Sequence, residues 1–123
     1  MEYKTSFRKA TDQRDIYHTG FYRYIEISYA GLVAALGEPH DCTKTDGAWW
    51  CGDGKIRAQW AFKNRSKKYP TTVTFYDYKD DRPFEKIQEW HIGAKGDRNK
   101  IDEFLKTYFP NATITKLTPD IIL

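Results

Sequence analysis

Hydrophobic and polar residues alternate in several short stretches of the chain, and this period of two predicts β-strands. In residues 21–27, Ile25 and Ile27 fall on one side, whereas Tyr22 and Tyr24 fall on the other. The same pattern, together with residues that favour strands, predicts further strands in four stretches of the chain: 56–63, 71–78, 89–92 and 112–117.

Two other segments place apolar residues at the spacing of a helix. The first helix is predicted to begin after Ser28, which can cap it, and to end at Gly37. The second is predicted to begin after Asp97 and to end before Pro110, because proline cannot continue a helix. Each helix has one apolar stripe, which must pack against a sheet.

The predicted order is strand, helix, three strands, helix, strand. Such an order predicts an α+β fold, in which an antiparallel sheet of about five strands carries two short helices on one face. Residues 1–20 lack a hydrophobic period, so we expect a leader that is partly flexible or ordered only by docking on the domain. Residues 21–123 are predicted to form a single domain.

Composition narrows the class of protein. Hydrophobic residues make up 40% of the chain and aromatic residues 16%, which is enough for a core without disulfides or metal. A net charge of +3 is too small for a dedicated nucleic-acid binder. No run of 18 apolar residues occurs, so we expect no membrane span and a cytoplasmic location. The sequence does not predict the oligomeric state.

Strand alternation predicts a polar and aromatic surface on the sheet face away from the helices. Aromatic rings there could stack on bases, and the basic turn near Lys67 and Lys68 could attract phosphate. An ordinary solvated sheet face has the same residue types. The predicted binding residues are Tyr22, Tyr24, Arg57, Gln59, Tyr76, Tyr78, His91, Lys67 and Lys68, with Thr74 and Glu89 on the same face.

Histidine and cysteine offer an alternative chemistry. His40, Cys42, Cys51 and His91 could together bind zinc, although neither a Cys-x-x-Cys nor a His-x-x-x-His spacing is present. We therefore expect no metal and no other cofactor, and cysteines that are free thiols rather than a Cys42–Cys51 disulfide.

Catalysis by a cysteine would need a histidine base and a carboxylate that orients the histidine. Asp41, Asp53 and Asp77 could supply the carboxylate, but no spacing selects one trio, so we predict no catalytic residues. Asp77 also shares a face with Val73 and Phe75, where it would need Lys79, Arg82 or a backbone donor as partner. Alternatively, the strand has ended and Asp77 begins the turn.

Five short motifs carry a resemblance: Leu36-Gly37-Glu38-Pro39, Asp53-Gly54-Lys55, Trp60, Tyr76-Asp77-Tyr78-Lys79 and Trp90-His91-Ile92-Gly93. Together they resemble a family of small uncharacterised phage and large-virus accessory proteins, over roughly residues 24 to 105. The resemblance implies a viral accessory role in the host cytoplasm, such as counteracting a host defence. It implies no particular functional residues.

These observations predict a non-enzymatic binding protein of viral type that holds a protein, a nucleotide or a nucleic acid. The alternatives are a small hydrolase or transferase that uses histidine and cysteine, and a structural subunit of a virion.

Overall fold

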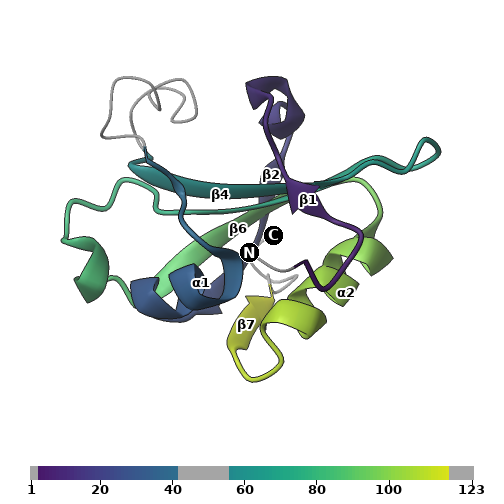
Figure 1. The fold of residues 1–123 in the computed structure, drawn as a ribbon. Coiled ribbons are helices and arrows are strands. Elements are labelled where there is room, and N and C mark those ends of the chain that lie inside the picture. The colour runs from purple at the N-terminus through teal and green to yellow at the C-terminus, as the bar shows by residue number, and fades with distance from the viewer. Residues whose placement is uncertain (1–2, 42–55, 117–123) are drawn as a thin grey trace, which may run out of the picture.

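An antiparallel sheet forms the centre of the fold, and both helices pack against one of its faces (Figure 1). The computed structural model describes residues 3–41 and 56–116. The strands are β1 (Arg8–Lys9), β2 (Gly20–Glu26), β3 (His40–Asp41), β4 (Ala58–Asn64), β5 (Thr71–Tyr76), β6 (Glu89–Lys95) and β7 (Thr113–Lys116). The helices are α1 (Tyr29–Leu36) and α2 (Arg98–Tyr108), with 3₁₀ turns η1 (Gln13–Ile16) and η3 (Phe84–Lys86).

The strand order across the sheet is β1-β4-β5-β6-β2-β7, and β3 also pairs with β4. All strand pairs are antiparallel. The predicted α+β class is thereby confirmed, and β2, β4, β5, β6 and β7 are the predicted strands. The short strands β1 and β3 extend the sheet, and β1 comes from the stretch predicted to be a leader.

Local sequence signals account for the ends of both helices. The Ser28 Oγ accepts a hydrogen bond from the Gly31 amide, and Gly37 ends α1 at a φ of 82°, which favours glycine. Asp97 caps α2 in the same way by accepting from the Asn99 amide. Strand β6 is longer than predicted, because Gly93 does not end it but continues to pair with Thr74 on β5.

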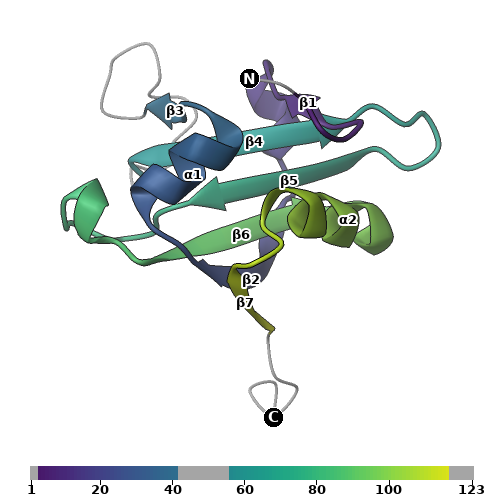
Figure 2. The ribbon, with the colours of Figure 1, turned by 60° about the horizontal axis from the view of Figure 1, so that its bottom comes forward.

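The hydrophobic core lies between the helices and the sheet (Figure 2). Trp60 and Trp90 of the sheet meet edge to face at 5.5 Å between ring centroids, and both are fully buried. On the helix side, Leu32 of α1 and Phe104 of α2 are equally buried. Phe7 from the N-terminal segment also enters this core and contacts Phe104 at 5.0 Å.

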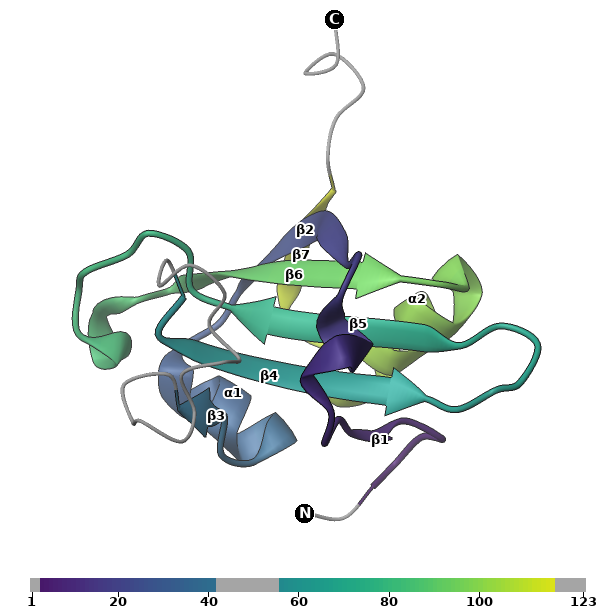
Figure 3. The ribbon, with the colours of Figure 1, turned by 90° about the horizontal axis from the view of Figure 1, so that it is seen from above.

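The N-terminal segment then crosses the opposite face of the sheet, from β1 at one side to β2 near the other (Figure 3). The Asp15 carboxylate of this segment bonds the Lys63 ammonium at 2.7 Å, and the Tyr17 carbonyl accepts a hydrogen bond from Lys95. Ile16 packs on a small cluster that contains Ala61. One half of this face is therefore covered by a segment for which docking on the domain was one of the two expectations. The predicted binding surface did not take this cover into account.

Coverage by this segment explains burial on both faces of the central strands. Thr72 and Thr74 point away from the helices, yet each is only 1% exposed. Thr74 was predicted to lie on a binding face. It lies instead on the half of the sheet face that the N-terminal segment covers.

Candidate binding surface

Cross-strand pairing arranges the open half of the sheet face in a row that runs across the strands. Because paired residues point to the same face, this row can be read directly from the register. From β3 to β7 the row is His40, Gln59, Tyr76, His91, Tyr24 and Thr115. Gln59, predicted to be a binding residue, is buried in this row at 4% exposure, so the accessible part begins at Tyr76.

A cluster of rings is centred on His91. Tyr76 stacks on the imidazole at 5.3 Å with an interplanar angle of 22°, and Tyr24 meets it edge-on at 4.9 Å. Phe21 and Tyr78 each lie 5.7 Å from the imidazole. These side chains, which we call the ring cluster, include two that are well exposed: Phe21 at 38% and Tyr78 at 41%. Offset and edge-on ring contacts are favourable, so the cluster is a packed platform with an exposed surface.

Gly93 makes this close packing possible. A Cβ at Gly93 would lie 2.6 Å from the Thr74 Oγ1 and 3.2 Å from Cε1 of Tyr76. Without that carbon, the Tyr76 ring lies directly against the backbone of β6 next to His91. Gly93 therefore has a packing role in the ring cluster.

Tyr22 does not belong to the ring cluster. The pairing of β2 with β6 shifts between Phe21 and Arg23, which marks a bulge, and a bulge re-aims side chains. The Tyr22 hydroxyl consequently bonds the Asp102 carboxylate of α2 at 2.8 Å on the helix side. The prediction from strict alternation was wrong here, because it placed Tyr22 on the open face and did not include Phe21. No local sequence signal predicted the bulge.

Arg57 lies at the end of the sheet rather than on its face. Its Nε bonds Asp77 at 2.9 Å, its Nη2 donates to the Arg82 carbonyl at 2.6 Å, and its guanidinium lies 4.7 Å from the Phe84 ring centroid. Asp77 is 2% exposed and also accepts hydrogen bonds from the amides of Arg57 and Ala58. β5 ends at Tyr76, so Asp77 does begin the turn, but it is also buried and its side-chain partner is Arg57 rather than Lys79 or Arg82.

The basic turn lies at the other end of the sheet from the ring cluster. Lys67 and Lys68 are in the loop between β4 and β5, which joins Asn64 to Thr71, whereas Tyr76 is at the far end of β5. Thr71 and Tyr76 are five residue steps apart along β5, a distance of about 17 Å. The N-terminal segment crosses the sheet face between the two regions (Figure 3). The sequence prediction treated them as one surface, and the structure does not bring them together.

Two carboxylates lie in the row beside Tyr24 and His91 of the ring cluster. In the next row, Glu26 on β2 pairs directly with Glu89 on β6, next to Tyr24 and His91. A hollow of about 360 Å³ at this end of the strands is lined by both glutamates, Ile27 and Gln88. Like charges placed directly opposite each other destabilise a sheet, so this pair does not serve the fold.

Burial and charge act in opposite directions on His91. Burial among the rings lowers the pKa of the imidazole, while the negative charges of Glu89, Asp77 and Asp80 raise it, and burial is the larger cause. The Nδ1 atom of His91 is buried and has no hydrogen-bond partner among the residues that the structure describes. Burial likewise raises the pKa of the Tyr76 hydroxyl, with smaller contributions from Tyr78 and Tyr24.

His40 and His91, the two histidines of the predicted zinc site, do not form a joint site. His40 and His91 lie in the same row but three strand spacings apart, roughly 14 Å, with Gln59 and Tyr76 between them. Among the residues described, 3–41 and 56–116, no group of three or more possible metal ligands comes together. Cys42, Cys51 and Asp53 lie outside the described residues.

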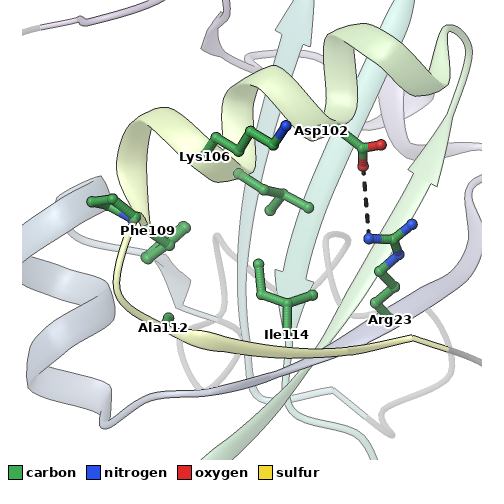
Figure 4. A pocket seen from close by; sticks show the side chains of 8 residues that line it. Arg23, Asp102, Lys106, Phe109, Ala112 and Ile114 are labelled. Atoms are coloured by element: carbon green, nitrogen blue, oxygen red, sulfur yellow. Dashed lines mark ion pairs between the residues drawn. The ribbon is translucent and has the colours of Figure 1, made fainter.

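A second hollow lies on the helix side, between α2 and β7 (Figure 4). It has a volume of about 270 Å³, and Arg23 and Asp102 face each other at its rim, 3.9 Å apart. Leu105, Phe109 and Ile114 supply apolar walls. Because Asp102 also holds the Tyr22 hydroxyl, these groups tie α2 to the bulge in β2.

Comparisons of this chain with protein families, with curated proteins and with solved structures found no match. Within its described residues, the chain has no helix with the length and apolar character needed to cross a membrane.

Proposed function

We propose that this protein is a non-enzymatic binding protein, and that the ring cluster is the surface with which it holds its partner. The observation that carries the proposal is the exposed, packed group of rings around His91 on an otherwise half-covered sheet face. Aromatic side chains with exposed area and few rotatable bonds are typical of binding hot spots. The partner belongs to one of the classes that the sequence predicted: a protein, a nucleotide or a nucleic acid.

The geometry favours a protein partner over a nucleic acid. A nucleic-acid surface combines stacking rings with a basic groove that follows the phosphates. Here the carboxylates of Glu26 and Glu89 lie in the row next to Tyr24 and His91, and a single ammonium, that of Lys79, is recorded beside the described rings of the cluster, at Tyr78. Lys67 and Lys68 of the basic turn lie at the other end of the sheet. The role of a viral accessory protein that counteracts a host defence, implied by the sequence resemblance, stays part of the proposal.

A titration followed by NMR tests this function. Aromatic signals of the protein are recorded while single-stranded DNA, RNA, mononucleotides and short peptides of different charge are added in turn. We expect at least one probe to shift the signals of His91 and Tyr78, and the variant Tyr78→Ala to weaken that binding by about 1–2 kcal/mol. Tyr69→Ala is the matched control, because Tyr69 is also exposed but lies in the β4–β5 loop.

The proposal is wrong if no probe shifts the NMR signals of His91 and Tyr78, or if Tyr69→Ala weakens binding as much as Tyr78→Ala.

A further inference from the structure

We propose that the ring cluster, together with Glu26 and Glu89, is a docking site for an arginine side chain presented by a basic segment of a protein partner. The proposal rests on the binding function given above and names the chemistry of the partner. It is argued from charge complementarity, from the geometry of the rings and from the way this chain holds its own arginines.

The charge argument starts from the register of β2 and β6. Glu26 and Glu89 are directly opposite each other, so their Cβ atoms are about 5 Å apart. Among the described residues, no hydrogen bond or ion pair joins either glutamate side chain to another residue. Both side chains are exposed, and their like charges repel each other on these neighbouring positions. A cation bound between the two carboxylates would remove the repulsion. Their position therefore selects a positively charged partner.

The rings add a preference for a planar cation. Tyr24 and His91 lie in the row beside the two glutamates, and Tyr78 contacts the imidazole from the end of the sheet. A guanidinium can stack on an aromatic face while its N–H groups form paired bonds with a carboxylate, which a lysine ammonium cannot do. Lys79 lies 5.4 Å from the Tyr78 ring centroid, so one ring of the cluster already contacts a cation.

The same chain holds one of its own arginines by this combination. The Arg57 guanidinium lies 4.7 Å from the Phe84 ring centroid and bonds the Asp77 carboxylate at 2.9 Å. Arg23 repeats the arrangement more loosely, 4.6 Å from the Tyr22 ring centroid and 3.9 Å from Asp102. At the ring cluster, Glu26 and Glu89 occupy the row next to Tyr24 and His91, and no arginine of the described residues contacts these rings or these carboxylates.

The test uses a set of peptides of equal length that differ at one central residue: arginine, lysine, citrulline or glutamate. Citrulline has the planar shape of arginine but no charge. Binding is measured by calorimetry and located by the NMR signals of His91 and Tyr78. We expect the arginine peptide to bind at the ring cluster about tenfold more tightly than the citrulline peptide, and to weaken as salt is added.

The double variant Glu26→Gln/Glu89→Gln should bring the arginine and citrulline peptides to equal affinity, because only the charge preference is removed. Glu103→Gln is the matched control: Glu103 is an exposed glutamate on α2, away from the sheet face, and its removal should leave the preference intact. Thermal unfolding of each variant shows that the fold is kept.

Four results would overturn the inference. Equal binding of citrulline and arginine peptides at the ring cluster, or binding of an oligonucleotide there in place of the basic peptide, would leave the binding function standing but make the partner wrong. If the double variant still prefers the arginine peptide over the citrulline peptide, the binding function again stands and the inferred partner is wrong. If no probe shifts the NMR signals of His91 and Tyr78, both the proposed binding function and this inference are wrong.

Discussion

Asp77 offers the sharpest test of how the end of the sheet is held. Its carboxylate is buried and accepts three hydrogen bonds: from the amide of Arg57 at 2.8 Å, from the amide of Ala58 at 3.1 Å and from the Arg57 Nε at 2.9 Å. These bonds tie the start of β4 to the end of β5. Replacing Asp77 by alanine leaves the two amides and the guanidinium without their acceptor.

The expected cost follows from these contacts. Breaking a buried ion pair by removing one partner costs about 3–5 kcal/mol, because the other charge is left uncompensated. The Arg57 side chain is 31% exposed, so water recovers part of the loss and the lower end applies. We expect Asp77→Ala to lower the free energy of unfolding by about 3 kcal/mol. Asp77→Asn keeps an acceptor oxygen for the amides and should cost about half as much.

Urea denaturation followed by circular dichroism measures the change. With a slope of about 2 kcal/mol per molar urea, Asp77→Ala should lower the midpoint by about 1.5 M. Asp80→Ala is the control, since Asp80 forms its ion pair with Arg82, whose side chain is 57% exposed, and such a pair contributes at most about 1 kcal/mol. A loss below about 1 kcal/mol for Asp77→Ala, or one no larger than that of the control, would refute this reasoning.

Three further predictions address the core, the ring cluster and the pH dependence of stability. Phe104→Ala should destabilise the fold by about 3–5 kcal/mol in the same assay, because the ring is fully buried; a loss under 1 kcal/mol would contradict the assigned face of α2. Gly93→Ala should move the Tyr76 ring away from His91, which the NMR signals of the imidazole would report, and unchanged signals would count against the close packing. Burial, helped by the charge of Lys9, lowers the pKa of His40 from 6.5 to about 4, so its contribution to stability is complete above pH 6.5 and is lost as the pH falls toward 4. The variant His40→Gln should flatten the stability profile in that window, and an unchanged profile would show that His40 is not the cause.

Short-range signals in the sequence were enough for the elements and for the fold class. The period of two placed β2, β4, β5 and β7 near their observed positions, and the caps Ser28 and Asp97 marked the starts of both helices. Such signals depend on residues within a few positions of one another, so they can be read without knowledge of the rest of the chain. The pairing of two apolar helical stripes with one sheet face follows from the need to bury them.

The candidate surface was predicted only in part, because its boundaries depend on contacts between distant segments. Tyr24, Tyr76, Tyr78 and His91 were placed on the open face by alternation alone, and the structure gathers them. The bulge that exchanges Tyr22 for Phe21 has no sequence signature, since it arises from the register between β2 and β6.

Only the tertiary structure decided which half of the face stays open and what charge surrounds the rings. The N-terminal segment has no hydrophobic period, yet it covers Thr72 and Thr74 through contacts with Lys63 and Lys95, which are far from it in sequence. The strand order likewise sets Glu26 beside Glu89 and leaves Lys67 and Lys68 at the other end of the sheet. The sequence by itself determined which residues could form strands and helices. Which side chains share one surface was determined by the docking of segments that are distant in sequence. The physical reason is that strand pairing and the covering of a sheet face act between residues that only the fold brings together.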